Sequence, residues 1–178
     1  MIVKDINECD FVNYKKPSMF LAFPTCSMKC DELNGAPVCQ NCRLAQEPNI
    51  SISKEEVCER YINNPLTNSI VFGGMEPFDS NLDVISLIDC LRNKYNCNDD
   101  VVIYTGYTKE ELIQGYRTNQ EPEAAKAIKT FWDTLISYPN IIIKFGRFIV
   151  NSESRYDDIL GVKLASKNQY AEVVSRVK

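Results

Sequence analysis

Four cysteines lie within 17 residues in the spacing C-x3-C-x8-C-x2-C, and they are Cys26, Cys30, Cys39 and Cys42. Thiolates grouped on a loop are ligands for zinc or for an iron–sulfur cluster. The chain has eight cysteines and no histidine. Ser-His-Asp triads, Cys-His dyads and histidine-containing zinc sites are therefore excluded, and thiolates or carboxylates must hold any metal. From the cysteines alone, zinc and iron–sulfur are equally supported.

A second motif, Gly73-Gly74-Met75-Glu76-Pro77, directly follows the apolar run Ile70–Phe72. Two glycines at the end of a strand allow the backbone to approach a ligand closely, and Pro77 favours a turn into the next helix. The Glu76 carboxylate can accept a hydrogen bond from an ammonium group. On its own the motif is equally typical of a tight turn. A cysteine loop after one strand and this turn after the next is hard to obtain from a zinc module, so the pairing favours iron–sulfur.

The scaffold for these motifs is indicated by four short apolar runs, Met19–Phe23, Ile70–Phe72, Val101–Tyr104 and Ile141–Phe145. They are rich in β-branched and aromatic residues and mostly do not alternate, which is typical of strands buried on both faces of a parallel sheet. The cysteine loop, residues 24–43, begins where the first run ends. In such folds chemistry is found at the carboxyl ends of the strands.

Helix signals lie between these runs. Ser53 with Glu56, and Thr108 with Glu111, have the spacing of a capping box, and Pro122 suits the first position of a helix. Strands alternating with helices predict an α/β fold with a mainly parallel sheet. Since no repeat or linker is recognisable, we expect residues 1–178 to form one domain.

Composition narrows the classes of partner. The net charge of −4 argues against a nucleic-acid surface, which usually needs a basic excess. No run approaches the ~18 apolar residues of a membrane span, and the first residues lack the apolar core of a signal peptide. We therefore expect neither nucleic acid nor membrane as a partner, and a cytoplasmic location. Disulfides are rare there, so the cysteines point to metal or catalysis.

The paired motifs resemble the radical S-adenosylmethionine superfamily, whose signature is C-x3-C-x2-C after the first barrel strand and Gly-Gly-Glu-Pro after the second. Within it, the chain is similar to the activating proteins of anaerobic ribonucleoside-triphosphate reductase, through Cys39-Gln40-Asn41, the Tyr-Thr-Gly-Tyr-Thr stretch at 104–108 and Gly146-Arg147-Phe148. The chain departs from the family in having eight residues between the second and third cysteine, in the extra Met75, and in lacking an Asn- and Gly-rich approach to Cys26.

The resemblance implies a single-domain partial (β/α) barrel and a [4Fe–4S] cluster with three cysteine ligands, whose free iron binds S-adenosylmethionine. It implies one-electron cleavage of that cofactor to methionine and a 5′-deoxyadenosyl radical. The implied partners are a large glycyl-radical protein, a class III ribonucleotide reductase, and an electron donor such as flavodoxin. Residues expected to contact the cofactor are Gly73, Gly74, Met75, Glu76, Tyr104 and Thr105.

Four cysteines compete for three ligand positions. We favour Cys26, Cys30 and Cys39, which keep the C-x3-C spacing and leave Cys42 as a spare thiol. The alternative set replaces Cys30 by Cys42, as in some carboxy-deazaguanine synthases, but the Asp-Thr that follows the last ligand there is Arg43-Leu44 here.

Two further questions stay open at this level. Lys29 and Arg147 are candidates for pairing with a cofactor carboxylate, and the alternative for each is a solvated surface charge. The alternatives to a glycyl-radical activase are a radical enzyme acting on a small nucleotide-derived substrate and a binding module stapled by a four-cysteine zinc site.

Overall fold

A six-stranded sheet forms the centre of the computed structural model, which describes residues 1–114 and 122–176. Its strand order is β10-β7-β6-β5-β3-β2, and the four inner strands are parallel whereas both edge strands are antiparallel to their neighbours. The strands span Asp5–Asp10 (β2), Ser18–Phe23 (β3), Ser69–Gly74 (β5), Asp100–Tyr104 (β6), Ile141–Phe145 (β7) and Tyr170–Val173 (β10). The four apolar runs of the sequence are the four parallel strands, which confirms that prediction.

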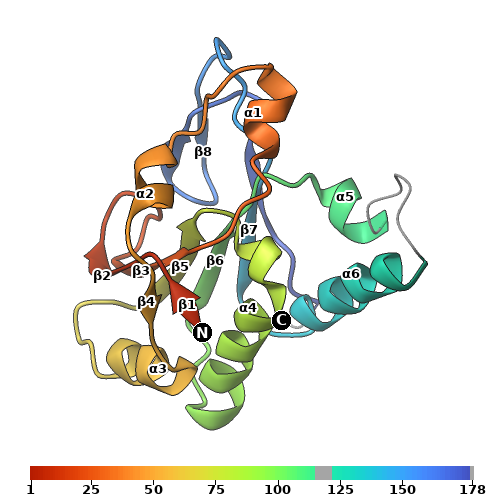
Figure 1. The fold of residues 1–178 in the computed structure, drawn as a ribbon. Helices are drawn as coiled ribbons and strands as arrows, with labels where there is room; N and C mark the ends of the chain where they lie inside the picture. Colours follow the sequence, from red (N-terminus) through yellow and green to blue (C-terminus); the bar gives the residue numbers. More distant parts are fainter. Residues whose placement is uncertain (115–121, 177–178) are drawn as a thin grey trace.

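Helices and short strands complete the chain (Figure 1). The α-helices are α1 (Lys29–Asn34), α2 (Cys42–Gln46), α3 (Lys54–Ile62), α4 (Asn81–Asp89), α5 (Lys109–Gln114) and α6 (Pro122–Leu135). A 3₁₀ turn spans Pro77–Ser80, and a π-helical turn, Cys90–Lys94, extends α4. Two antiparallel pairs lie outside the main sheet: β1 (Ile2–Val3) with β4 (Ile50–Ser51), and β8 (Arg155–Asp157) with β9 (Val162–Leu164).

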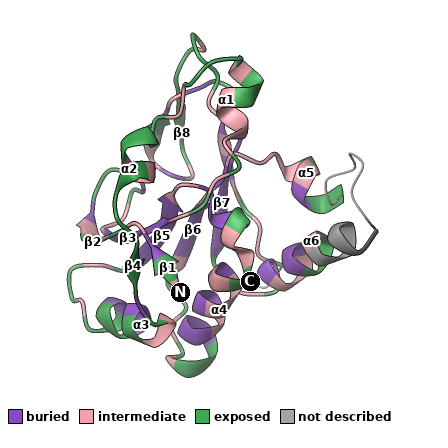
Figure 2. Cartoon of the chain, viewed as in Figure 1, coloured by how far each residue is buried: buried purple, intermediate pink, exposed green. Residues whose placement is uncertain are grey.

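The parallel strands are buried on both faces because a separate cluster of hydrophobic side chains covers each face. Side chains from α3, α4 and α6 pack with Leu21, Phe72 and Ile103 on one face. Alternate residues of the same strands, among them Val71 and Val102, pack on the other face with Tyr14 and with side chains of residues 160–171. Figure 2 shows β5, β6 and β7 largely buried, whereas α1 and α2 are intermediate or exposed. The non-alternating apolar pattern follows from this two-sided burial.

The local helix signals are also confirmed. The Ser53 hydroxyl accepts a hydrogen bond from Glu56 N at the start of α3. At α5 the box is reciprocal, because Thr108 Oγ1 accepts from Glu111 N while Glu111 Oε2 accepts from Thr108 N. The chain thus has the predicted α/β fold with a mainly parallel sheet. None of the helices in residues 1–114 and 122–176 is long and apolar enough to cross a membrane.

Candidate metal and cofactor site

The carboxyl ends of the four parallel strands surround a cavity of about 430 Å³. Its walls include every residue that the sequence nominated as a ligand or cofactor contact: Cys26, Cys30, Cys39, Gly73, Gly74, Met75, Glu76, Tyr104 and Thr105. Cys42 is exposed and does not line the cavity. Nominated residues from three separate parts of the chain therefore meet at one place, and the fourth clustered cysteine stays outside it.

Two of the thiols are placed by the turn that leaves β3. Met28 adopts a left-handed conformation with φ 55° just before α1, and its N–H donates to Cys26 Sγ at 3.2 Å. The Cys30 thiol lies beside Gly106, where a methyl group on the glycine would come within 3.9 Å of the sulfur. Burial raises the pKa of the Cys26 thiol to about 11. In the metal-free protein this thiol is therefore protonated at neutral pH, and binding iron must displace its proton.

The Gly-Gly turn is bonded to the cysteine loop. Gly74 has φ +81°, and a Cβ there would lie 2.7 Å from Ala22 Cβ on the neighbouring strand. Both facts require glycine at this position. Met75 N donates to Phe23 O at 3.2 Å, and Glu76 N donates to Thr25 O at 2.7 Å. The turn is therefore fixed directly against the segment that leads to Cys26.

Glu76 joins the ends of two parallel strands. Its side chain is only 6% exposed. Oε1 accepts from the Thr105 hydroxyl at 2.8 Å and from Phe78 N at 3.1 Å, and Oε2 accepts from Gly106 N at 2.8 Å. Burial raises the pKa of the carboxyl to about 7, although these hydrogen bonds oppose the rise. The sequence nominated Glu76 as an acceptor for an ammonium group; the structure shows both of its carboxylate oxygens accepting hydrogen bonds from residues of the protein itself.

Lys144 is a site residue that the sequence analysis missed. It occupies β7, is 6% exposed, lines the cavity, and donates from Nζ to Gly146 O at 2.8 Å. Burial lowers its pKa to about 8, while the nearby Glu76 carboxylate opposes the fall. The available signal was a lysine inside an otherwise apolar strand, Ile-Ile-Ile-Lys-Phe, because lysine is almost never fully buried without a reason.

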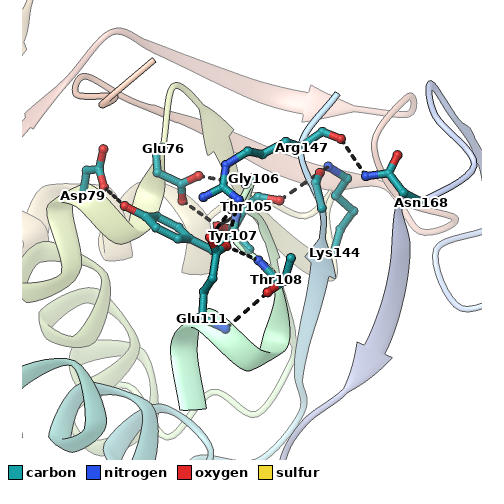
Figure 3. A network of polar contacts seen from close by, with 11 residues as sticks. Glu76, Asp79, Thr105, Gly106, Tyr107, Thr108, Glu111, Lys144, Arg147 and Asn168 are labelled. Atoms are coloured by element: carbon teal, nitrogen blue, oxygen red, sulfur yellow. Dashed lines mark hydrogen bonds and ion pairs between the residues drawn. The ribbon is translucent and has the colours of Figure 1, made fainter. Parts of the chain in front are cut away.

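Lys29 and Arg147 meet at Tyr107, at the edge of this site. Lys29 Nζ lies 5.2 Å and Arg147 Cζ lies 5.3 Å from the centre of the Tyr107 ring. Arg147 Nη1 also donates to both carboxylate oxygens of Glu111, at 2.8 and 3.0 Å, and Tyr107 donates to Asp79 at 2.7 Å (Figure 3). Arg147 is therefore neither a simple surface charge nor free to turn wholly towards a ligand.

The donor set fits an iron–sulfur cluster. Three thiols line one cavity, and the chain offers no histidine that could complete a different site. Among the described residues, no three or more His, Cys, Asp or Glu side chains are arranged around a point that could hold a single metal ion. A cubane cluster does not need such convergence, because each cysteine binds a different iron atom.

Fold and site together define a cluster-binding α/β protein whose thiols face a cofactor-sized cavity beside a Gly-Gly turn. A comparison with protein families gives the same class, since the model of the 4Fe-4S single cluster domain matches residues 18–158. The chain therefore belongs to this family of radical S-adenosylmethionine type. Comparisons with curated proteins and with solved structures found no match.

Proposed function

We propose that this protein reductively cleaves S-adenosylmethionine and uses the resulting radical to install a glycyl radical on a large partner, an anaerobic ribonucleotide reductase. The observation that carries the proposal is the single cavity shared by Cys26, Cys30, Cys39 and the Gly-Gly turn. Membership of the 4Fe-4S single cluster domain family supports it.

The proposed ligands are Cys26, Cys30 and Cys39, which leave one iron of a [4Fe–4S] cluster for the cofactor. When bound, the cluster supplies the electron that splits S-adenosylmethionine into methionine and a 5′-deoxyadenosyl radical. No protein base is required for this chemistry, which is compatible with the absence of histidine. The protein's part is to bind, orient and shield the reacting groups.

Particular residues suit these tasks. Gly74 lets the backbone of the turn lie close to a ligand, and the buried ammonium of Lys144 places a positive charge in a cavity where a cofactor carboxylate needs one. Tyr104 and Thr105 contribute the β6 wall. We expect Lys144→Met to weaken binding of S-adenosylmethionine about 10- to 100-fold, the value of a hydrogen bond to a charged group, and calorimetric titration measures this directly.

A protein substrate is favoured over a small one by the size of the cavity. Small-molecule sites usually measure about 300–1,000 Å³, and this one of about 430 Å³ must already accommodate the cofactor. A loop of a partner protein can reach the mouth of the cavity without needing a second enclosed pocket. The substrate class proposed here is therefore a backbone glycine presented by a folded partner.

The test is electron paramagnetic resonance on a reaction mixture prepared without oxygen. The reconstituted protein, dithionite and S-adenosylmethionine are added to a purified glycyl-radical ribonucleotide reductase. We expect a carbon-centred glycyl signal on the reductase, absent with Cys30→Ala and retained with Cys42→Ala. Formation of 5′-deoxyadenosine without any radical on the reductase would reject the activase role and favour a small nucleotide-derived substrate.

A further inference from the structure

The inserted segment between Cys30 and Cys39 poses a geometric problem. Nine residue steps separate the two cysteines, and an extended chain of that length reaches ~30 Å. Both thiols nevertheless line the same cavity. Specific contacts must therefore turn the chain back towards the site and hold it there.

We propose that Asp31 is the positioning residue that presents Cys39, and not Cys42, to the cluster; the inference rests on the proposed function in taking Cys39 as a ligand. Asp31 Oδ1 accepts hydrogen bonds from two consecutive backbone amides, Val38 N at 2.8 Å and Cys39 N at 2.9 Å. A single carboxylate oxygen thus ties the residue after Cys30 to Cys39 itself.

The backbone between these two points is shaped for the return. Helix α1 ends at Asn34 and is capped by Gly35, which has φ 63°. Gly35 N donates to Glu32 O, and Ala36 N donates to Asp31 O, both at 3.2 Å. The insertion therefore forms one short helix followed by a turn that reverses the chain direction. The hydrogen bonds to the Asp31 side chain close this loop.

The contacts beyond Cys39 separate it from Cys42. The Asn41 side chain donates to Gly74 O and so fastens the loop to the Gly-Gly turn. Cys42 then begins α2, whose far end is held by Lys4 Nζ, donating to Ala45 O at 3.0 Å and Glu47 O at 2.6 Å. Cys39 and Asn41 therefore line the cavity, whereas Cys42 is exposed and does not.

Asp31 acts through geometry and not through its charge. Its contacts to the returning loop are two hydrogen bonds that one side-chain oxygen accepts from backbone amides, and an uncharged oxygen can accept both. An asparagine at this position keeps an oxygen that can accept from both amides but removes the charge, so it is the informative conservative variant.

The experiment compares the full-length protein with Asp31→Ala, Asp31→Asn and Glu32→Ala, the last a matched control at an exposed position of the same helix. After anaerobic reconstitution, the rate of iron loss to a chelator is measured. We expect Asp31→Ala to lose iron about 10- to 100-fold faster than the natural protein, the range for residues that orient metal ligands. Asp31→Asn and Glu32→Ala should lose iron as slowly as the natural protein.

A second readout needs no cluster. In the metal-free chains, alkylation of individual cysteines is followed by peptide mass spectrometry. Cys39 should react faster in Asp31→Ala than in Asp31→Asn, with Cys42 unchanged in both. Equal Cys39 rates in these two variants, or iron loss from Asp31→Asn as fast as from Asp31→Ala, would overturn the proposal. A natural protein that takes up no cluster would instead reject the proposed function, while the alkylation result would still decide the role of Asp31.

Discussion

The Thr105 hydroxyl donates a 2.8 Å hydrogen bond to Oε1 of Glu76, and this buried contact joins the carboxyl ends of β5 and β6. Gly106 N donates to the other oxygen of the same carboxylate. Two neighbouring strand ends are thereby held in one register directly beside the cysteine cavity. The carboxylate that the sequence nominated for a ligand is thus first of all a connector within the protein.

Removing this connector is expected to destabilise the metal-free protein. Glu76→Ala leaves the Thr105 hydroxyl and two backbone amides without their acceptor, at about 1–3 kcal/mol for each group that stays buried. Thr105→Val removes both the donor to Glu76 and the acceptor of Tyr107 N, and should lower the free energy of unfolding by about 1–2 kcal/mol, whereas Thr105→Ser keeps the hydroxyl. Urea denaturation measures these values. Equal stability of the Val and Ser variants would show that the two hydrogen bonds of this hydroxyl contribute nothing.

The pH dependence of stability tests the burial of the same carboxyl. The pKa of Glu76 is raised from 4.5 to about 7 in the folded protein, mainly by burial. Between these values the folded state binds the proton more tightly than the unfolded state, so the contribution of Glu76 to the unfolding free energy falls as pH rises from about 4.5 to 7. Glu76→Gln removes this titration.

The measurement is the difference in unfolding free energy between the natural protein and Glu76→Gln at several pH values. As pH rises from about 4.5 to 7, the unfolding free energy of the natural protein should fall relative to that of Glu76→Gln, by at most about 1.4 kcal/mol per pH unit. Above pH 7 the difference should become constant. Other carboxylates titrate in both proteins and cancel. Two parallel curves would show that Glu76 is not desolvated.

The scaffold was predictable from the sequence because its signals are local or periodic. The runs that became β3, β5, β6 and β7 carry the two-sided apolar pattern of buried parallel strands, and the Ser53 and Thr108 caps use contacts three residues apart. Once a mainly parallel sheet was predicted, the shared position of Cys26 and Glu76 followed from the rule that chemistry lies at the carboxyl ends of the strands.

Contacts between distant residues were not predictable in this way. Nothing in the spacing of Glu76 and Thr105 indicates their hydrogen bond, since they are 29 positions apart. The hydrogen bond from Cys39 N to Asp31 depends on how the insertion folds. The apolar run around Lys144 indicates that this lysine is buried, but not that it lines the cavity. Tertiary packing decides each of these.

Gly74 and Gly35 form a matched pair for testing the close approach of the turn. Both have positive φ, but a Cβ at Gly74 would meet Ala22 at 2.7 Å, whereas nothing lies within 4 Å of a Cβ at Gly35. We expect Gly74→Ala to lower the unfolding free energy by about 2–5 kcal/mol through strain and overpacking. Gly35→Ala should lower it by about 1 kcal/mol, which is the cost of the left-handed backbone conformation alone. A similar small loss in both variants would contradict the close packing of β5 on β3.

The ligand set is tested by iron content. Alanine variants of Cys26, Cys30 and Cys39 should each fail to retain a cluster after anaerobic reconstitution, because three ligands are needed and each lines the cavity. Cys42→Ala should retain iron and sulfide at the level of the natural protein, since its thiol is exposed and lies outside. Full iron in Cys30→Ala together with its loss in Cys42→Ala would assign the ligands to the alternative set.

The most direct test of the central claim is the formation of 5′-deoxyadenosine. The anaerobically reconstituted protein is mixed with dithionite and S-adenosylmethionine, and the products are quantified by mass spectrometry. The natural protein and Cys42→Ala should form 5′-deoxyadenosine and methionine, and Cys39→Ala should form neither. A natural protein that carries a complete [4Fe–4S] cluster yet forms no 5′-deoxyadenosine would contradict the account.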